Sequence, residues 1–289
     1  LAQQGYATAF FQSADRHFED RARLVRNAGY QHFEARQDLD PPLEPLGYLG
    51  GDDLGLVQPL LRWTAKQQGP FLATVLTSTA HHPYDLPTRL LGDDELADAP
   101  DWPQSKRYFR IVIEADRVLR QIVEGLAAQG HTDDLMIVVM GDHGEAFGEH
   151  GIFQHDNVFW EEGLHVPFVI HHPARIAPGT VITAPRSLID VSPTILDLLG
   201  IPVEPWAFDG HSVLSPPPLP DRRYFACWYD QSCVGFVEGR HKLVYLPSAR
   251  TWLAFDLDTD PDERHVIQND PAWAEQADEV RKWYDMHRY

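Results

Sequence analysis

The sequence has little cysteine, no long hydrophobic run and a deficit of basic residues. Its two cysteines, Cys227 and Cys233, are too few for a disulfide framework. The longest apolar runs, such as Leu135 to Met140, are far shorter than the roughly 20 residues that span a bilayer. Lys and Arg number 24 against 43 Asp and Glu, which gives a net charge of −19. A surface this acidic repels a phosphate backbone, so general nucleic-acid binding is not expected.

The composition that remains is that of an ordinary soluble globular protein. Hydrophobic residues make up 43% of the 289 positions and charged residues 23%, which excludes a disordered or fibrous chain. The length suffices for one large domain or two modest ones. The chain starts at Leu1 rather than at methionine, and its first residues already read as folded sequence. We therefore expect a mature form or a fragment whose true start lies upstream.

The two cysteines allow two interpretations. They flank Asp230 symmetrically, so they could face each other across a hairpin and form a disulfide. That pairing would imply an oxidising compartment. Two buried thiols, each behaving as a small apolar side chain, fit the sequence equally well.

Apolar, β-branched runs alternate with helical patterns over the first two thirds of the chain. Asp53 is expected to cap the second helix, and Ser192 to cap the last one with Pro193 in its first turn. The proline-rich and acidic stretch 82–104 is expected to be an exposed loop. Together the pattern predicts an α/β fold with a mostly parallel central sheet and helices on both faces. The expected strands are 6–11, 71–77, 135–140 and 166–170, and the expected helices are 15–28, 54–68, 106–129 and 194–199.

The pattern changes after the proline run at 216–218. Four short runs at close spacing follow, and then an amphipathic stretch at 271–287. This predicts a small antiparallel sheet with one helix. We therefore expect a core domain over residues 1–218 and a C-terminal α+β subdomain over 219–289. The four short strands are expected at 223–229, 234–238, 242–246 and 252–255.

A dense polar cluster follows the run that ends at Met140. It contains Asp142 and His143 between glycines, and His155 lies twelve residues further on, beyond a glycine-rich loop. Ligands bind at the carboxyl ends of strands in open parallel sheets. A carboxylate beside an imidazole suits Zn²⁺ or Mn²⁺. The cluster therefore predicts a metal site, whereas an isolated Asp-His pair would more often be a polar turn.

A second polar segment, Ser78 to Tyr84, also follows an apolar strand. One of its imidazoles, His81 or His82, could reach an anionic substrate oxygen. Paired histidines before a proline also occur in loops with no functional role, so this signal is weak by itself. His150 is expected to be structural or exposed.

Several motifs resemble the sulfatase-like branch of the alkaline phosphatase superfamily, which implies an alkaline phosphatase-like fold. Within that branch, the chain most resembles lipoteichoic acid synthase-like phosphoglycerol transferases and the related phosphoethanolamine transferases. The resemblance covers nearly the whole chain. It rests on Gly-Asp-His-Gly-Glu-x-x-Gly-Glu-His-Gly at 141–151, His-Val-Pro-Phe-Val-Ile at 165–170, the segment 190–200, and Lys242-Leu243 with the acidic segment 255–263.

The resemblance implies roles for five residues. Asp142 and His143 match two ligands of the catalytic divalent metal. His81 matches a histidine that meets the substrate phosphate. His155 matches one that lies beside the phosphate or a second metal. Arg21 falls on an arginine that binds glycerol phosphate.

The chain also departs from the family pattern. Gln12, Ala14 and Glu19 stand where the lipoteichoic acid synthases have His, Asp and Trp, so we expect a different head-group pocket. The family's nucleophile, a Thr or a Cys in Cys-x-Pro-x-Arg, precedes the segment equivalent to Tyr6, as does an acidic metal ligand. No such segment is found, and we expect both to lie upstream of Leu1. The 289-residue chain alone is then expected to be inactive and to bind metal weakly.

These observations favour a metal-dependent enzyme domain that transfers or hydrolyses a phosphoglycerol- or phosphoethanolamine-type phosphate ester. Zn²⁺ or Mn²⁺ is the expected metal. The expected substrate is an anionic lipid-borne or glycan molecule outside the cytoplasm, with membrane attachment through upstream sequence. One alternative is a sulfatase or phosphodiesterase of the same superfamily, which would use Ca²⁺ or Mg²⁺ if it is a true sulfatase. Another is an inactive module that binds anionic glycans.

Overall fold

The computed structural model describes residues 1–91, 105–155, 159–204, 206–216, 221–227, 232–268 and 271–287. Most of the loop expected at 82–104 therefore lies outside the described residues. The chain divides into two compact units, residues 1–134 and 135–289, and each is described here by itself. The domain boundary expected at residue 218 stays a prediction.

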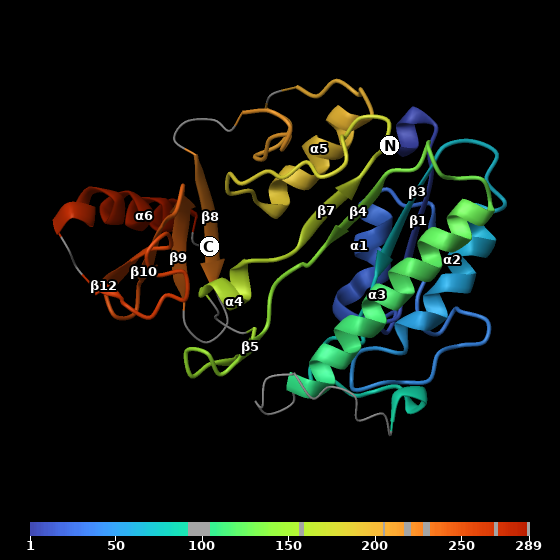
Figure 1. Ribbon diagram of the computed structural model, residues 1–289, viewed down its shortest axis with the longest axis horizontal. Coiled ribbons are helices and arrows are strands. Elements are labelled where there is room, and N and C mark those ends of the chain that lie inside the picture. The colour runs from blue at the N-terminus through green and yellow to red at the C-terminus, as the bar shows by residue number, and fades with distance from the viewer. Residues whose placement is uncertain are drawn as a thin grey trace. The chain divides into compact units, whose positions relative to one another are not determined.

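The first unit is built on a parallel sheet of three strands (Figure 1). They are β1 (Ala7–Gln12), β2 (His32–Glu34) and β3 (Phe71–Leu76), in the order β2-β1-β3. Ala7 lies opposite Phe71 and Gln12 opposite Leu76, so β1 and β3 end at the same edge of the sheet. The residues that follow these two strands are thereby brought together.

Helices cover both faces of this sheet. The chain crosses from β1 to β2 through α1 (Arg21–Asn27) and returns past β1 to β3 through α2 (Val57–Thr64), and right-handed crossovers in opposite directions place the two helices on opposite faces. The long helix α3 (Ser105–Ala128) packs beside α2. The expected layered α/β architecture is confirmed. The core on the α2 and α3 side contains Ala9, Phe11, Leu39, Leu56 and Leu60, with Trp63, Val75 and Ile122 packed against them.

Two helix starts differ from expectation in this unit. The helix expected from residue 15 begins only at Arg21. Glu19 and Asp20, the last two residues of the 3-10 turn η2 (Phe18–Asp20), adopt a left-handed backbone (φ 51°) and so interrupt the helix. The prediction that Asp53 caps the second helix is wrong. Asp52 caps the 3-10 turn η3 (Asp53–Leu56), since its carboxylate accepts the Leu54 N–H, while Asp53 is buried.

The second unit begins with two short antiparallel pairs. β4 (Ile137–Met140) pairs with β7 (Phe168–His171), and β5 (Ala146–Phe147) pairs with β6 (Phe153–Gln154). The apolar runs predicted β4 and β7, but an apolar run does not reveal strand direction. One helical turn, α4 (Glu161–Leu164), precedes β7.

The helix α5 (Val191–Leu198) also starts earlier than expected. Ser187 and Asp190 form a reciprocal capping box around the 3-10 turn η5 (Leu188–Asp190), which runs directly into the helix. Ser192 is therefore inside the first turn and is not the cap. The other 3-10 turns are η1 (Ala2–Gln4), η4 (Thr88–Leu90) and η6 (Pro271–Trp273).

The expected C-terminal antiparallel sheet with one helix is confirmed. Its order is β12-β11-β10-β9-β8, and α6 (Ala274–His287) packs on it. Cys227 and Cys233 lie directly opposite each other on β8 and β9 and form a disulfide, so the paired interpretation is the right one. The strands are β8 (Arg222–Cys227), β9 (Cys233–Glu238), β10 (His241–Leu246), β11 (Thr251–Asp256) and β12 (Ile267–Gln268).

This sheet is buried on both faces. Successive residues point to opposite sides, so Leu243 packs under α6 while Val244 packs with Phe159 on the other side. Lys242 lies on the same side as Val244 and is completely buried. Its Nζ lies 2.7 Å from Glu263 Oε1.

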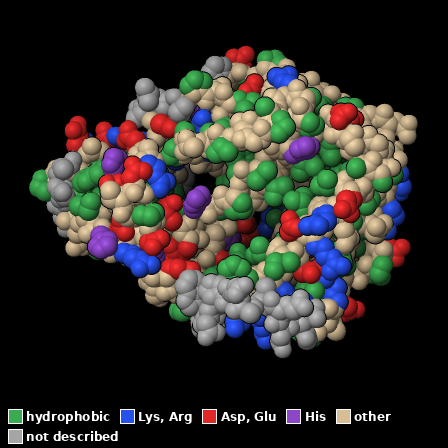
Figure 2. All heavy atoms as spheres, viewed as in Figure 1, with side chains coloured by type: hydrophobic (Ala, Val, Ile, Leu, Met, Phe, Trp, Pro, Cys, Tyr) green, Lys and Arg blue, Asp and Glu red, His purple; other side chains and the backbone are tan. Residues whose placement is uncertain are grey.

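The surface carries both signs of charge. On the face that Figure 2 shows, Asp and Glu side chains are interspersed with Lys and Arg side chains. Such mixing is typical of a solvated protein surface. Among the described residues, no helix is both long enough and apolar enough to span a membrane.

Candidate functional site

The polar loop that follows β4 is held by close backbone contacts. Gly141 N–H donates to the Pro167 carbonyl at 3.1 Å, and Gly144 N–H donates to the Gly163 carbonyl at 2.9 Å. A Cβ on Gly144 would lie 2.0 Å from the Glu162 carbonyl oxygen. Glycine is therefore the residue that lets this loop approach α4 so closely.

Three side chains from this loop converge on one point. His143, Glu145 and His155 can each offer one ligand atom, and these atoms lie within 4.8 Å of one another. The two imidazole rings stack with their centroids 4.2 Å apart. The short β5–β6 hairpin brings His155 back to His143, as the sequence predicts for a glycine-rich loop.

Short contacts to oxygen atoms orient both imidazole rings. His143 Nδ1 lies 2.8 Å from the Gly144 carbonyl oxygen, and His155 Nδ1 lies 2.9 Å from Glu145 Oε2. A carbonyl oxygen accepts, so His143 Nδ1 carries the hydrogen and the lone pair of the neutral ring is on Nε2. His155 Nδ1 and Glu145 Oε2 are close enough to bind one ion together once the ring hydrogen is on Nε2.

The donor set suits a divalent metal. Two imidazole nitrogens with one carboxylate match the ligands of many catalytic zinc sites. The side chain of Glu145 is only 6% exposed, so its charge is held in a shielded position beside His155. Sequence reasoning did not select Glu145. The available signal was its residue type, a carboxylate in the same short polar loop as His143.

Asp142 lies beside this cluster. Its Oδ1 accepts the His143 N–H at 3.0 Å, and its Oδ2 lies 3.7 Å from His143 Nε2. The side chain is 77% exposed. Its carboxylate thus faces the nitrogen of His143 that carries the lone pair, and its role as a metal ligand stays a prediction.

His150 has a structural role, in line with expectation. Its ring stacks on Trp160 with centroids 3.9 Å apart. Nδ1 lies 2.7 Å from Glu162 Oε1, and Nε2 lies 3.1 Å from the Asp262 carbonyl oxygen. His150 therefore ties the loop to α4 and to the segment after β11.

The two other predicted site residues belong to the first unit. His81 Nδ1 lies 2.9 Å from the His82 carbonyl oxygen and 3.1 Å from the Tyr48 hydroxyl. Arg21 is the first residue of α1 and pairs with Glu19 at 3.0 Å. The convergence of Arg21 and His81 with the cluster of the second unit stays a prediction.

Several curated proteins are similar in sequence to this chain. A choline-sulfatase of Rhizobium meliloti is 33% identical over 177 residues, which covers 57% of this chain and 33% of that protein. The lipoteichoic acid synthase-like protein YvgJ of Bacillus subtilis is 26% identical over 230 residues, which covers 74% of this chain and 36% of that protein. The chain thus spans about a third of the length of these curated relatives.

Solved structures show the same fold. The crystal structure of the lipoteichoic acid synthase LtaP from Listeria monocytogenes superposes with a TM-score of 0.74 at 22% identity. That superposition covers 99% of this chain and 70% of the other. The alkaline phosphatase-like fold is therefore confirmed.

Family models cover nearly the whole length. The model of the C-terminal region of N-sulphoglucosamine sulphohydrolase matches residues 148–288. The sulfatase model matches residues 1–201, which include both units' candidate residues and more than two thirds of the sequence. On that match, the chain belongs to the sulfatase family.

Proposed function

We propose that the intact protein is a metal-dependent enzyme that transfers or hydrolyses a phosphate ester of the phosphoglycerol or phosphoethanolamine type. The observation that carries this proposal is the convergence of His143, Glu145 and His155 after β4. Support for a phosphate ester comes from relatives named as lipoteichoic acid synthases or similar proteins, whose alignments cover 74% of the chain.

In this proposal His143, Glu145 and His155 hold the divalent ion, with Asp142 as a further ligand. Zn²⁺ and Mn²⁺ are the metals that best fit imidazole and carboxylate donors together. When bound, the ion supplies a positive charge that stabilises charge on phosphoryl oxygens. The Gly144 carbonyl orients His143, and Glu145 would bind the ion beside His155, whose Nδ1 lies 2.9 Å from Glu145 Oε2.

His81 and Arg21 bind the anionic group. Arg21 offers a planar fork that matches two phosphate oxygens, and its present partner Glu19 is 65% exposed and can move into solvent. His81 offers an imidazole that the His82 carbonyl and the Tyr48 hydroxyl orient. Replacing Arg21 by Lys should weaken substrate binding because the fork is lost.

Among the residues that the structure describes, none is assigned as the nucleophile in this proposal. Cys227 and Cys233 are joined in a disulfide and cannot act as nucleophiles in that state.

The substrate is proposed to be an anionic lipid-borne or glycan molecule outside the cytoplasm. The disulfide supports an oxidising compartment, because such bonds persist in secreted and periplasmic proteins and are rare in the cytosol. Attachment of the intact protein to a membrane is part of the same proposal.

Sulfate-ester hydrolysis is the second candidate. The choline-sulfatase relative, at 33% identity, and the match to the C-terminal model of N-sulphoglucosamine sulphohydrolase favour it. Sulfate and phosphate esters share a tetrahedral anion, so the residues named above would serve either substrate.

The test is turnover by the intact protein of three nitrophenyl esters, namely the phosphate monoester, the phosphate diester and the sulfate. We expect metal-dependent release of nitrophenol from a phosphate ester, its loss in His143→Ala, and little change in His165→Ala, whose exposed ring lies outside the cluster. Faster turnover of the sulfate would select the second candidate. Activity of the metal-free protein would contradict both.

A further inference from the structure

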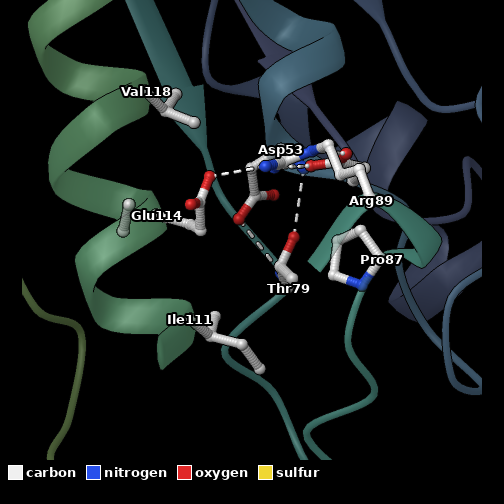
Figure 3. A pocket seen from close by; sticks show the side chains of 9 residues that line it. Asp53, Thr79, Pro87, Arg89, Ile111, Glu114 and Val118 are labelled. Atoms are coloured by element: carbon white, nitrogen blue, oxygen red, sulfur yellow. Dashed lines mark hydrogen bonds and ion pairs between the residues drawn. The ribbon is translucent and has the colours of Figure 1, made fainter. Parts of the chain in front are cut away.

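Asp53 is a buried carboxylate that the proposed reaction does not use. It begins η3 and is 4% exposed. Among the described residues, no Lys, Arg or His forms an ion pair with it. Arg89 is close, but it pairs with Asp52 and Glu114 instead (Figure 3). A buried carboxylate is costly unless hydrogen bonds compensate it, so its partners indicate its role.

Those partners are the backbone of the segment that follows β3. Asp53 Oδ1 accepts the Ser78 N–H at 2.9 Å, and Oδ2 accepts the Thr79 N–H at 3.1 Å. In return, Thr79 Oγ1 accepts the Asp53 N–H at 3.1 Å and donates to the Gly51 carbonyl at 3.0 Å. Hydrogen bonds in both directions thus join the start of η3 to the segment after β3, as Figure 3 shows for Asp53 and Thr79.

The same carboxylate also contacts the end of β1. Ser13, which follows β1, hydrogen-bonds Asp53 through its hydroxyl, and the Ser13 and Ser78 oxygens are 2.6 Å apart. Both serines follow strands that end at the same edge of the sheet. Asp53 therefore lies at the point where the two loops leave the sheet.

His81 is the next element along this chain of contacts. Its N–H donates to the Ser78 carbonyl at 3.1 Å, which closes a turn over residues 78–81. Asp53 holds the first two N–H groups of that turn, and His81 is its last residue. The position of the imidazole is therefore set by a turn whose start is fixed by the carboxylate.

We propose that Asp53 is a positioning residue that fixes the turn 78–81 and thereby places the His81 ring to receive the substrate's anionic group. This rests on the proposed function for the role of His81. Both carboxylate oxygens are needed, because they accept two consecutive N–H groups that no single amide oxygen could accept in the same geometry.

The space around Asp53 restricts what can replace it. A cavity of about 10 Å³ lies between Asp53, Thr79 and Glu114. It has room for about one water molecule at most, so Asp53→Glu would force a methylene group into a filled space. Asp53→Asn is therefore the closest isostere, since it keeps the shape and loses one of the two acceptors.

The experiment uses the 289-residue chain and compares Asp53→Asn with Ser13→Ala and a control, Thr64→Val. Thr64 is also buried and lies in the same unit, but it is the last residue of α2 and its hydroxyl donates to Gln129 Oε1 at 2.8 Å. Two properties are measured by NMR, namely hydrogen exchange of the Ser78 and Thr79 amides and the ring ¹⁵N shifts of His81. Inorganic sulfate and phosphate are then titrated while the His81 ring is observed.

We expect Asp53→Asn to speed exchange at Ser78 and Thr79 at least tenfold, to change the His81 ring shifts, and to weaken anion binding at His81 at least tenfold. Ser13→Ala should show the same changes to a smaller extent, and Thr64→Val none. Unchanged His81 ring shifts in a folded Asp53→Asn chain would overturn the proposal. If anions leave the His81 ring of the unsubstituted chain unaffected, the role given to His81 fails instead, while the exchange and ring shifts still decide the positioning.

Discussion

The imidazole rings of His143 and His155 stack with their centroids 4.2 Å apart, although twelve positions separate them in the sequence. Each ring is oriented through Nδ1, one by a backbone carbonyl and the other by Glu145. Both rings are thereby held beside the Glu145 carboxylate, with one possible ligand atom of each residue within 4.8 Å of the others. This preorganisation is what a metal site requires of its ligands.

Glu145→Gln should weaken Zn²⁺ binding by at least tenfold. The substitution removes the negative charge of the cluster and replaces one of the two carboxylate oxygens by an NH2 group, which cannot bind a metal ion. Isothermal titration of the purified chain measures the affinity. His165→Gln is the matched control, because its ring is 80% exposed and lies outside the cluster. Equal affinities of the Glu145 variant and the unsubstituted chain would remove Glu145 from the site.

Glu263→Gln should lower the free energy of unfolding by about 1–3 kcal/mol, because the buried Lys242 loses one of its two carboxylate partners and keeps Glu161 at 3.2 Å. Lys242 is completely buried and lies 2.7 Å from Glu263. Glutamine can still accept the Glu161 N–H that Glu263 accepts now, so the loss would report the charge. Urea unfolding followed by circular dichroism measures it.

The double variant Lys242→Met with Glu263→Gln should recover most of that loss, because it leaves no charge buried and unpaired. Arg264→Ala serves as the control. Its exposed pair with Asp262 should contribute no more than about 1 kcal/mol. A double variant as unstable as Glu263→Gln would show that packing, rather than charge, dominates at this position.

Asp53→Asn should change how stability depends on pH. Burial raises the pKa of Asp53 above its ordinary value of 3.8. At a pH between the ordinary pKa and the raised pKa of the folded state, Asp53 is ionised in the unfolded chain and still protonated in the folded chain. Ionisation therefore favours unfolding in this pH range. The free energy of unfolding of the unsubstituted chain should therefore fall, relative to the Asn variant, as pH rises from about 4 through the folded pKa. Urea unfolding of both proteins from pH 4 to 7 measures this difference, and a constant difference would contradict it.

The Cys227–Cys233 disulfide should add about 2 kcal/mol to stability. This is a modest gain, because the two cysteines are separated by only 6 positions and the closed loop is short. Iodoacetamide should modify neither cysteine until a reductant is added, and the Cys227→Ala/Cys233→Ala variant should unfold at lower urea. Mass spectrometry reads the first result directly. Modification of both thiols in the unreduced protein would rule out the bond.

Sequence predicted the fold where periodicity is strong. The apolar stripe of α3 and the short strands of the C-terminal sheet come within a few residues of their expected bounds. It did not reveal that β4 and β7 pair antiparallel, and no residue of either strand is fully buried, so an apolar run predicted a strand without fixing its direction or its burial.

For the candidate site, the sequence predicted that His143 and His155 lie together but did not single out Glu145. His143 and His155 were predicted from their residue types and from the glycines between them, which allow a tight return. Glu145 was not selected, because the sequence does not show which carboxylate of the polar loop lies beside the two imidazoles. Asp52 and Asp53 are the same residue type at adjacent positions, so capping preference alone could not separate the half-buried cap Asp52 from the buried Asp53.

The most direct test of the account is a crystal of this chain grown with Zn²⁺ and measured at the zinc absorption edge. The account predicts one strong anomalous peak at about 2.0–2.2 Å from one ring nitrogen of His143, one ring nitrogen of His155 and a Glu145 oxygen. A well-ordered loop with no anomalous peak among these three side chains, or with the zinc bound elsewhere, would contradict it.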